Sequence, residues 1–271
     1  MAAHDNASPV RKRGARAPFP LPLPWSAMRD YYRITRKHSY SLLFALPLLL
    51  LYEVGAWSIQ GATSGMRNGA DVLLRGALAT GGVEGTTGLA VLLVLAGAVL
   101  VALERGRERV PLRMPVFAGM LAESAALAVV FGVVVGTVTQ WVLGGRLRLA
   151  ADGAAGLPVR DQVVLSLGAG LYEELLFRVL LVGGLVALFA ALGMKGRNRG
   201  IAAALLAAFL FSAFHYVGPY AYPLELQSFT FRFIAGLAFS GLYLLRGFGI
   251  AAWTHALYDV FLVLFMSTEV R

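Results

Sequence analysis

Cysteine is absent from this chain of 271 residues, and charged residues are scarce. Without cysteine, disulfides, thiolate metal sites and a cysteine nucleophile are all excluded. Asp, Glu, Lys and Arg make up 14% of the residues, whereas a soluble domain carries about 25%. Hydrophobic residues make up 58% and gather in long runs, so the composition predicts an integral membrane protein.

The apolar runs are close to the length of a helix that crosses a bilayer. They predict an all-α fold, a polytopic transmembrane helical bundle of about seven to eight spans. The Gly-rich segment at 60–85 is a loop, an interfacial helix or an extra short span. The seven main runs lie at 40–59, 86–103, 115–143, 162–191, 201–217, 229–245 and 249–268.

Basic residues outnumber acidic ones, and the formal net charge is +9. Most Lys and Arg lie in short connections between apolar runs, a pattern typical of membrane topology and not of nucleic-acid binding. With seven spans, the side that holds the N-terminus carries 16 of them and the other side six. The positive-inside rule therefore predicts a cytoplasmic N-terminus. We expect residues 1–39 to form a basic, disordered cytoplasmic arm, followed by a membrane bundle at 40–271.

Ionisable residues inside the apolar runs are the main clue to function. A fully charged side chain costs at least about 2.5 kcal/mol at the bilayer centre if it is unpaired. The stretch GLYEELLFRVLL at 170–181 holds three such residues. Glu174 and Arg178 share one helix face, whereas Glu173 points about 100° away. The other ionisable residues in the runs are Glu53, Glu123, His215, Arg232, His255 and Asp259.

Two of the four histidines, His215 and His255, lie in predicted spans. His255 and Asp259 are four residues apart, so an imidazole and a carboxylate share one helix face. Three predicted helices each offer a carboxylate or an imidazole. This favours one shared polar site over unrelated structural roles for each residue. A structural ion-pair cluster at 173–178 and a hydrogen-bonded core histidine at 215 stay open as alternatives.

Three short motifs follow one another on three predicted spans. EELLFR at 173–178 fits EExxxR, FSAFH at 211–215 fits FxxxH, and HALYD at 255–259 fits HxxxN/D. Together they resemble the CAAX-protease and bacteriocin-processing family of intramembrane endopeptidases, which includes the Ras-converting enzyme. The resemblance covers about residues 158–265. It implies a helical membrane bundle with a polar cavity, and proteolysis near the C-terminus of membrane-associated proteins.

The resemblance also implies roles for the motif residues. Glu173 and His215 would activate a water. His255 and Asp259 would stabilise the oxyanion. Glu174 and Arg178 would brace the site. Amide hydrolysis needs an activated water and donors aimed at the developing oxyanion, so these residue types suit the reaction in their own right.

A metal-dependent mechanism stays open beside the glutamate-dependent one. The N and O ligands that a divalent metal such as zinc would need are available from Glu173, His215, His255 and Asp259. Asp259 stands where Asn is common in the motif. Because an ionised Asp cannot donate a hydrogen bond to an oxyanion, Asp259 is expected to be protonated, to bind metal or to orient His255.

Other classes of membrane protease fit this sequence poorly. The HExxH motif of zinc proteases is absent, and Ala238 stands where the serine-type GxSG motif needs its first glycine. The paired-aspartate type lacks its second intramembrane Asp. The alternative functions are a transporter or proton relay that uses the same buried groups, and a catalytically silent immunity or scaffold protein.

The expected partners are the lipid bilayer and a membrane-associated protein substrate, with no nucleic acid. The composition favours a bacterial source, and thus the cytoplasmic (inner) membrane. Bacteria lack ordinary prenylated CAAX proteins. We therefore expect a substrate with a C-terminal anchor or sorting tail, as in the myxosortase-like branch of the family that the chain resembles.

Overall fold

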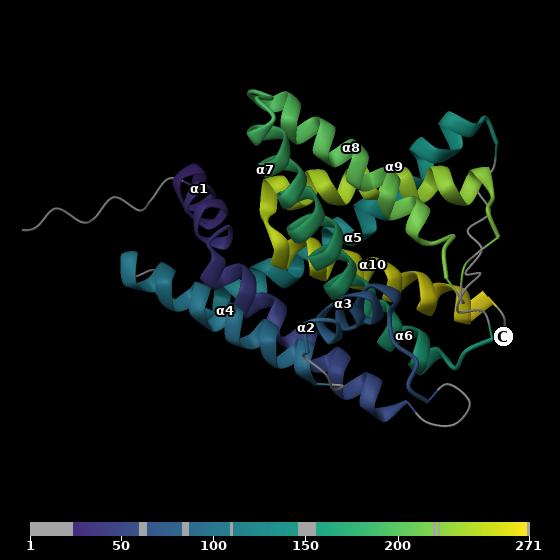
Figure 1. Ribbon diagram of the computed structural model, residues 1–271, viewed down its shortest axis with the longest axis horizontal. Coiled ribbons are helices and arrows are strands. Elements are labelled where there is room, and N and C mark those ends of the chain that lie inside the picture. Colours follow the sequence, from purple (N-terminus) through teal and green to yellow (C-terminus); the bar gives the residue numbers. More distant parts are fainter. Residues whose placement is uncertain are drawn as a thin grey trace, which may run out of the picture.

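The computed structural model describes residues 24–59, 64–82, 87–108, 111–145, 156–218, 221 and 223–269. Within these ranges the regular structure is entirely helical (Figure 1). Six of the described helices are long and apolar enough to cross a membrane, which confirms the polytopic helical bundle. The first 23 residues of the predicted arm lie outside the described residues.

Each predicted run corresponds to a helix whose ends differ from the prediction by at most four residues. The run at 162–191 is one continuous helix made of four consecutive elements. In chain order the elements are α1 (Pro24–Thr35), α2 (His38–Ser58), α3 (Gly69–Ala79), α4 (Gly88–Arg107), α5 (Met114–Leu143), α6 (Val159–Gly168), η2 (Ala169–Glu173), η3 (Leu175–Val182), α7 (Gly183–Ala191), α8 (Arg197–Phe214), α9 (Leu226–Arg246) and α10 (Phe248–Glu269).

Three segments refine the sequence-based expectation. Helix α1 lies inside the arm that was expected to be disordered. A hydrogen bond from the Tyr31 hydroxyl to Glu123 attaches this helix to α5. Helix α3 is not an extra span in the described part of 60–85, because its 11 residues extend only about 16 Å, too short to cross a bilayer. Helix α8 is not among the six candidate spans, because its first turn is polar (Arg197, Asn198, Arg199).

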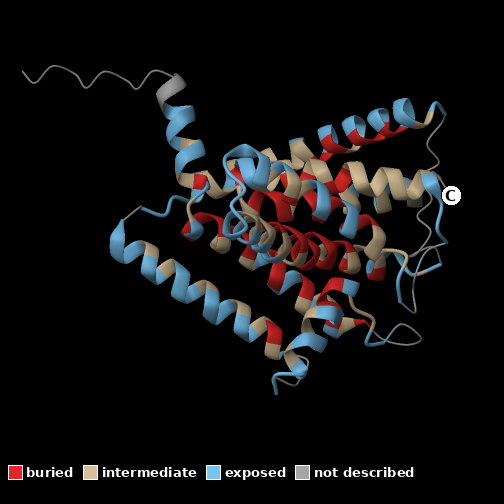
Figure 2. Ribbon diagram, turned by 45° about the horizontal axis from the view of Figure 1, so that its top comes forward, coloured by how far each residue is buried: buried red, intermediate tan, exposed pale blue. Residues whose placement is uncertain are grey.

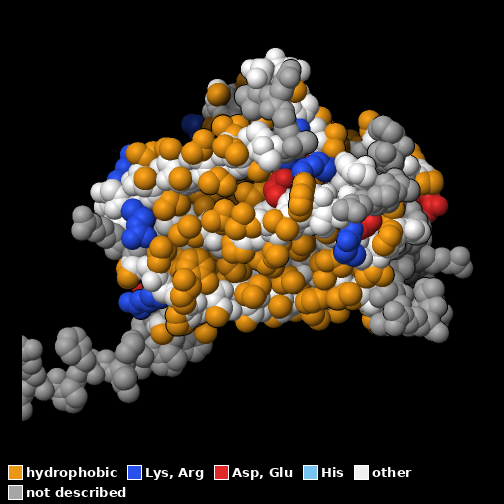
Figure 3. Space-filling view, turned by 90° about the horizontal axis from the view of Figure 1, so that it is seen from below, with side chains coloured by type: hydrophobic (Ala, Val, Ile, Leu, Met, Phe, Trp, Pro, Cys, Tyr) orange, Lys and Arg blue, Asp and Glu red, His pale blue; other side chains and the backbone are white. Residues whose placement is uncertain are grey.

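The centre of the bundle is formed by α2, α10 and the helix that runs from α6 to α7 (Figure 1). Their facing sides are buried, whereas α4 is almost wholly exposed at the edge (Figure 2). The face seen in Figure 3 is largely apolar, with charged side chains mostly toward its margins. Such a surface suits lipid, since hydrocarbon solvates apolar side chains as well as a protein core does.

Two glycines bring neighbouring helices close to the centre of this bundle. A Cβ on Gly168 would lie 2.3 Å from the Tyr52 ring of α2. A Cβ on Gly170 would lie 2.5 Å from the backbone oxygen of Ala252 and the backbone nitrogen of Ala256, both in α10. Because only a residue without a side chain fits there, these glycines set how closely α10 and α2 approach the helix that carries Glu173.

Candidate active site

The two adjacent glutamates lie on a stretch of π-helix. Residues Ala169–Glu173 (η2) and Leu175–Val182 (η3) have the wider turn, and Glu174 links them. A π-helical turn inside an α-helix is rare and often marks a functional site. Both carboxylates are buried within the bundle, Glu173 with 7% of its surface exposed and Glu174 with none.

Glu174 joins two helices through a single carboxylate oxygen. Its Oε1 lies 2.8 Å from Nδ1 of His255 in α10 and 3.2 Å from Nη1 of Arg178, one turn further along its own helix. Arg178 is also buried, with its guanidinium 4.4 Å from the centre of the Phe211 ring. The predicted Glu174–Arg178 pair is therefore present, and it extends to His255. Glu174 therefore braces its own helix against α10, because a buried carboxylate that loses its partners is left with an uncompensated charge.

His255 stands between two carboxylates. Its Nε2 lies 3.5 Å from Oδ2 of Asp259, beyond the ordinary hydrogen-bond range, while Nδ1 faces Glu174. The ring stacks on Phe239 of α9 at 4.4 Å between centres. The Asp259 side chain is half-buried, so this end of the histidine faces the more open part of the site.

His215 ends α8 and is fixed by its own backbone. Its Nδ1 lies 2.9 Å from the Phe211 carbonyl oxygen, which can only accept a hydrogen bond, so Nδ1 carries the proton. In the neutral ring Nε2 is then the unprotonated nitrogen. His215 lies close enough to Glu173, Arg232 and His255 for their charges to interact.

The four predicted catalytic residues lie in the same part of the bundle. Glu173 interacts electrostatically with the other three, as the convergence of three helices predicted. Its carboxylate is hydrogen-bonded at one oxygen: Nδ2 of Asn68 donates to Oε1 at 2.9 Å. Among the described residues, no hydrogen bond to the second oxygen is found.

The predicted metal ligands do not form a metal site in this geometry. Among the described residues, no three His, Cys, Asp or Glu side chains come together in a way that could hold a metal ion. One nitrogen of His255 is directed to Glu174 and one nitrogen of His215 to a backbone carbonyl. We therefore derive no step through a metal.

Asn68 is the residue at this site that the sequence analysis missed. It precedes α3 in the segment at 60–85, far from the three motifs in the chain. One signal was present, since an Asn followed three residues later by Asp71 resembles the start of a helix. That pattern locates the helix, and it says nothing of a contact with Glu173.

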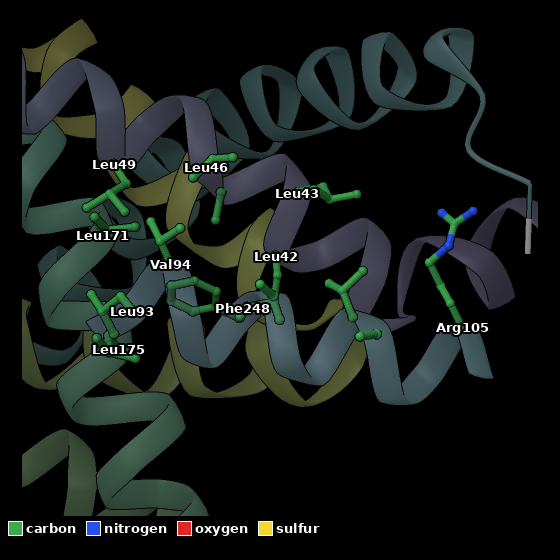
Figure 4. A pocket seen from close by; sticks show the side chains of 15 residues that line it. Leu42, Leu43, Leu46, Leu49, Leu93, Val94, Arg105, Leu171, Leu175 and Phe248 are labelled. Atoms are coloured by element: carbon green, nitrogen blue, oxygen red, sulfur yellow. The ribbon is translucent and has the colours of Figure 1, made fainter. Parts of the chain in front are cut away.

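An apolar groove lies beside the helix that carries the glutamates. Its volume is about 480 Å³, and Leu171 and Leu175 form one wall of it (Figure 4). Side chains of α2 and α4, together with Phe248 of α10, form the rest, and Arg105 lies at one end (Figure 4). None of the predicted site residues lines this groove, so the helix separates an apolar surface from the polar site.

Residues 156–261 match a family model described as Type II CAAX prenyl endopeptidase Rce1-like. These 106 residues, fewer than half of the chain, are similar to the CAAX-protease family. All three motifs fall within the match, whereas the helices from α1 to α5 lie outside it. No curated protein and no solved structure matches the chain.

The family assignment and the spans together define the class of protein. Members of the CAAX-protease family are intramembrane endopeptidases, and six candidate spans make this chain a multi-pass membrane protein. The geometry adds that the motif residues share one buried site within the bundle.

Proposed function

We propose that this protein hydrolyses a peptide bond with Glu173 as the general base. The observation that carries the proposal is the state of its carboxylate, which is buried beside His215 with one oxygen bound to Asn68. A water bound to the other oxygen of Glu173, beside the His215 ring, would lose a proton to the carboxylate. General-base assistance of this kind typically contributes 10²–10⁴-fold to a rate.

In this proposal His255 and Asp259 serve the opposite side of the scissile bond. A doubly protonated His255 donates Nδ1–H to Glu174 and directs Nε2–H toward Asp259. The 3.5 Å separation from Asp259 leaves that second donor available to an oxyanion. Asp259 then orients the ring, a role that does not require it to donate. Glu174 and Arg178 keep α10 in register with the glutamate helix.

The substrate in this proposal is a membrane-associated protein cut near its C-terminus, at an anchor or sorting tail of the myxosortase-like kind. This proposal is supported by the burial of Glu173, Glu174 and His255 within a bundle of candidate spans. The proposal retains a cytoplasmic N-terminus, a basic arm at the start of the chain, the CAAX-protease-like core at 158–265 and the bacterial inner membrane.

The test uses the full chain purified in detergent with a quenched peptide that ends in a membrane-anchor sequence. We expect cleavage by the wild type and at least a hundredfold lower kcat for Glu173→Gln and for His215→Ala. The carboxylate of Glu108 is exposed and pairs with Lys37, so Glu108→Gln is the control and retains full activity.

Two outcomes would contradict the proposal. Cleavage that persists in both Glu173→Gln and His215→Ala refutes the assignment of the site. If a chelator abolishes activity and Zn²⁺ restores it, the reaction needs a metal and Glu173 is not a metal-free base.

A further inference from the structure

We propose that Asn68 is a positioning residue of the active site, and that the start of α3 is part of the catalytic architecture. This inference rests on the proposed role of Glu173 as the base. Asn68 lies 105 residues from Glu173 in the chain and outside the residues that match the family model. The contact is therefore a feature of this chain that the three motifs do not contain.

The orientation of the Asn68 amide is fixed by its two partners. Oδ1 accepts a hydrogen bond from the backbone nitrogen of Ala70 at 2.9 Å, which caps the start of α3. Nδ2 donates to Oε1 of Glu173, also at 2.9 Å. An amide turned the other way would place an oxygen against a carboxylate and a nitrogen against an N–H, so one orientation is strongly preferred.

The start of α3 lies between the two helix segments that carry the proposed base and its histidine. Asn68 contacts Glu173 of η2, and a Cβ on the next residue, Gly69, would lie 3.4 Å from the Phe214 ring. Phe214 directly precedes His215 at the end of α8. The Asn68–Gly69 step therefore touches both sides of the site, and it determines where the free oxygen of Glu173 points.

A cluster of paired charges flanks this step. Arg67 and Arg75 each pair with both Glu53 and Asp71, at separations of 2.5–3.0 Å. Burial alone would lower the pKa of Arg67, but its hydrogen bonds to Glu53 and Asp71 outweigh burial, and the pKa is raised above its ordinary value. We call these four residues the α3 anchor.

Two tyrosines connect the α3 anchor with the site. The hydroxyl of Tyr52 donates to Asp71 at 2.8 Å and accepts from the backbone nitrogen of Asn68 at 3.1 Å. The hydroxyl of Tyr172, the residue before Glu173, donates to Glu53 at 2.7 Å. The anchor therefore holds both the Asn68 backbone and the helical turn that carries the base, so Asn68 and Glu173 keep a fixed separation.

The experiment separates the amide's contact with Glu173 from its role as a helix cap. Ser and Asp both cap helices about as well as Asn, so Asn68→Ser and Asn68→Asp keep α3 while removing the donor to Glu173. We expect Asn68→Ser to lower kcat about 10- to 100-fold with KM and melting temperature unchanged, because a slight misplacement of a base has effects of this size. Asn198→Ser, in the exposed first turn of α8, is the matched control and leaves kcat unchanged.

Asn68→Asp supplies a readout that a purely structural role would not change. It places a second carboxylate against Glu173, and two carboxylates in contact share a proton. We therefore expect a larger loss of kcat than for Asn68→Ser, and a pH–rate profile whose shape differs from that of the wild type.

The inference and the proposed function fail in different ways. If Asn68→Ser keeps the wild-type kcat, or only lowers the melting temperature, while Glu173→Gln is inactive, Asn68 does not position the base and the proposed function stands. If Glu173→Gln is itself active, the proposed function is wrong and the inference falls with it.

Discussion

Two clusters of buried ionisable residues in this bundle have opposite designs. In the first, Glu123 of α5 takes a two-pronged pair from Arg246 of α9, with separations of 2.6 and 2.7 Å. Tyr31 of α1 adds a third hydrogen bond to the same carboxylate. Both oxygens of Glu123 are thus bound by charged or hydroxyl donors. We call this group the closed cluster.

We call Glu173, Glu174, Arg178, His215, His255 and Asp259 the site cluster. It contains more ionisable groups than the closed cluster, and its central carboxylate, Glu173, makes fewer hydrogen bonds. Glu173 has one hydrogen bond among the described residues, from the uncharged amide of Asn68. Nε2 of His255 and Asp259 are 3.5 Å apart, so they face each other without a close contact. A saturated carboxylate has nothing left to offer a substrate, whereas an unsaturated one can bind water. By this measure the carboxylate of Glu123 is structural, whereas that of Glu173 can still bind water.

Glu123→Ala should have the largest effect on stability and little effect on the chemistry. It leaves the buried guanidinium of Arg246 without its partner and releases α1 from α5. Loss of one partner of a buried ion pair costs about 3–5 kcal/mol. We expect a melting temperature several degrees lower in detergent, with the kcat of the folded fraction unchanged.

A double variant tests whether the cost comes from the unpaired charge. Glu123→Leu combined with Arg246→Met removes both charges at once, and such replacements are often neutral. Recovery of most of the lost stability is the expected result. If the double variant is as unstable as Glu123→Ala, or if kcat falls in parallel, the closed cluster is not a separate structural unit.

The helices and the motif residues were predictable from the sequence because both signals are local. The length of an apolar run fixes a span, and this signal located all of the described spans within a few residues. The cost of a charge in hydrocarbon singles out Glu173, Glu174 and Arg178 without any knowledge of the fold. The same reasoning also singled out Glu53 and Glu123, and it could not say which carboxylates end up saturated.

The rest depended on contacts between distant segments. The bond from His255 to Glu174 rather than Glu173 depends on the π-helical turn and on the close approach at Gly170. The bond from Asn68 to Glu173 depends on where α3 lies against η2. Neither the helix rotation nor the placement of a short polar segment is encoded in hydropathy, so both were inaccessible to sequence reasoning.

Gly170→Ala should perturb the site cluster and leave the closed cluster intact. The new methyl group would lie 2.5 Å from the backbone of Ala252 and Ala256, which cannot move aside as a side chain could. Overpacking of this kind costs about 1–3 kcal/mol. Moving α10 away also lengthens the His255–Glu174 contact, so we expect a fall in both melting temperature and kcat.

Gly183→Ala is the matched control for that change, because it lies on the same continuous helix and a Cβ there meets no atom within 4 Å. Ala stabilises a helix relative to Gly by up to about 1 kcal/mol. The melting temperature of Gly183→Ala should therefore equal or exceed that of the wild type. An equal loss of activity in both variants would show that the helix itself, and not its contact with α10, governs the site.

Tyr31→Phe should have the smallest effect, and it tests the saturation of the closed cluster from its edge. Loss of one hydrogen bond to a carboxylate that keeps both Arg246 contacts costs about 1 kcal/mol. Burial, followed by the bond to Glu123, raises the pKa of Tyr31 above its ordinary value of 10.0. The unfolded chain therefore loses this proton first as pH rises, so the contribution of Tyr31 to stability is complete below about pH 10 and declines above it. The difference in melting temperature between wild type and Tyr31→Phe should shrink between pH 9 and pH 11, whereas a constant difference would mean that the hydroxyl is not bound to Glu123.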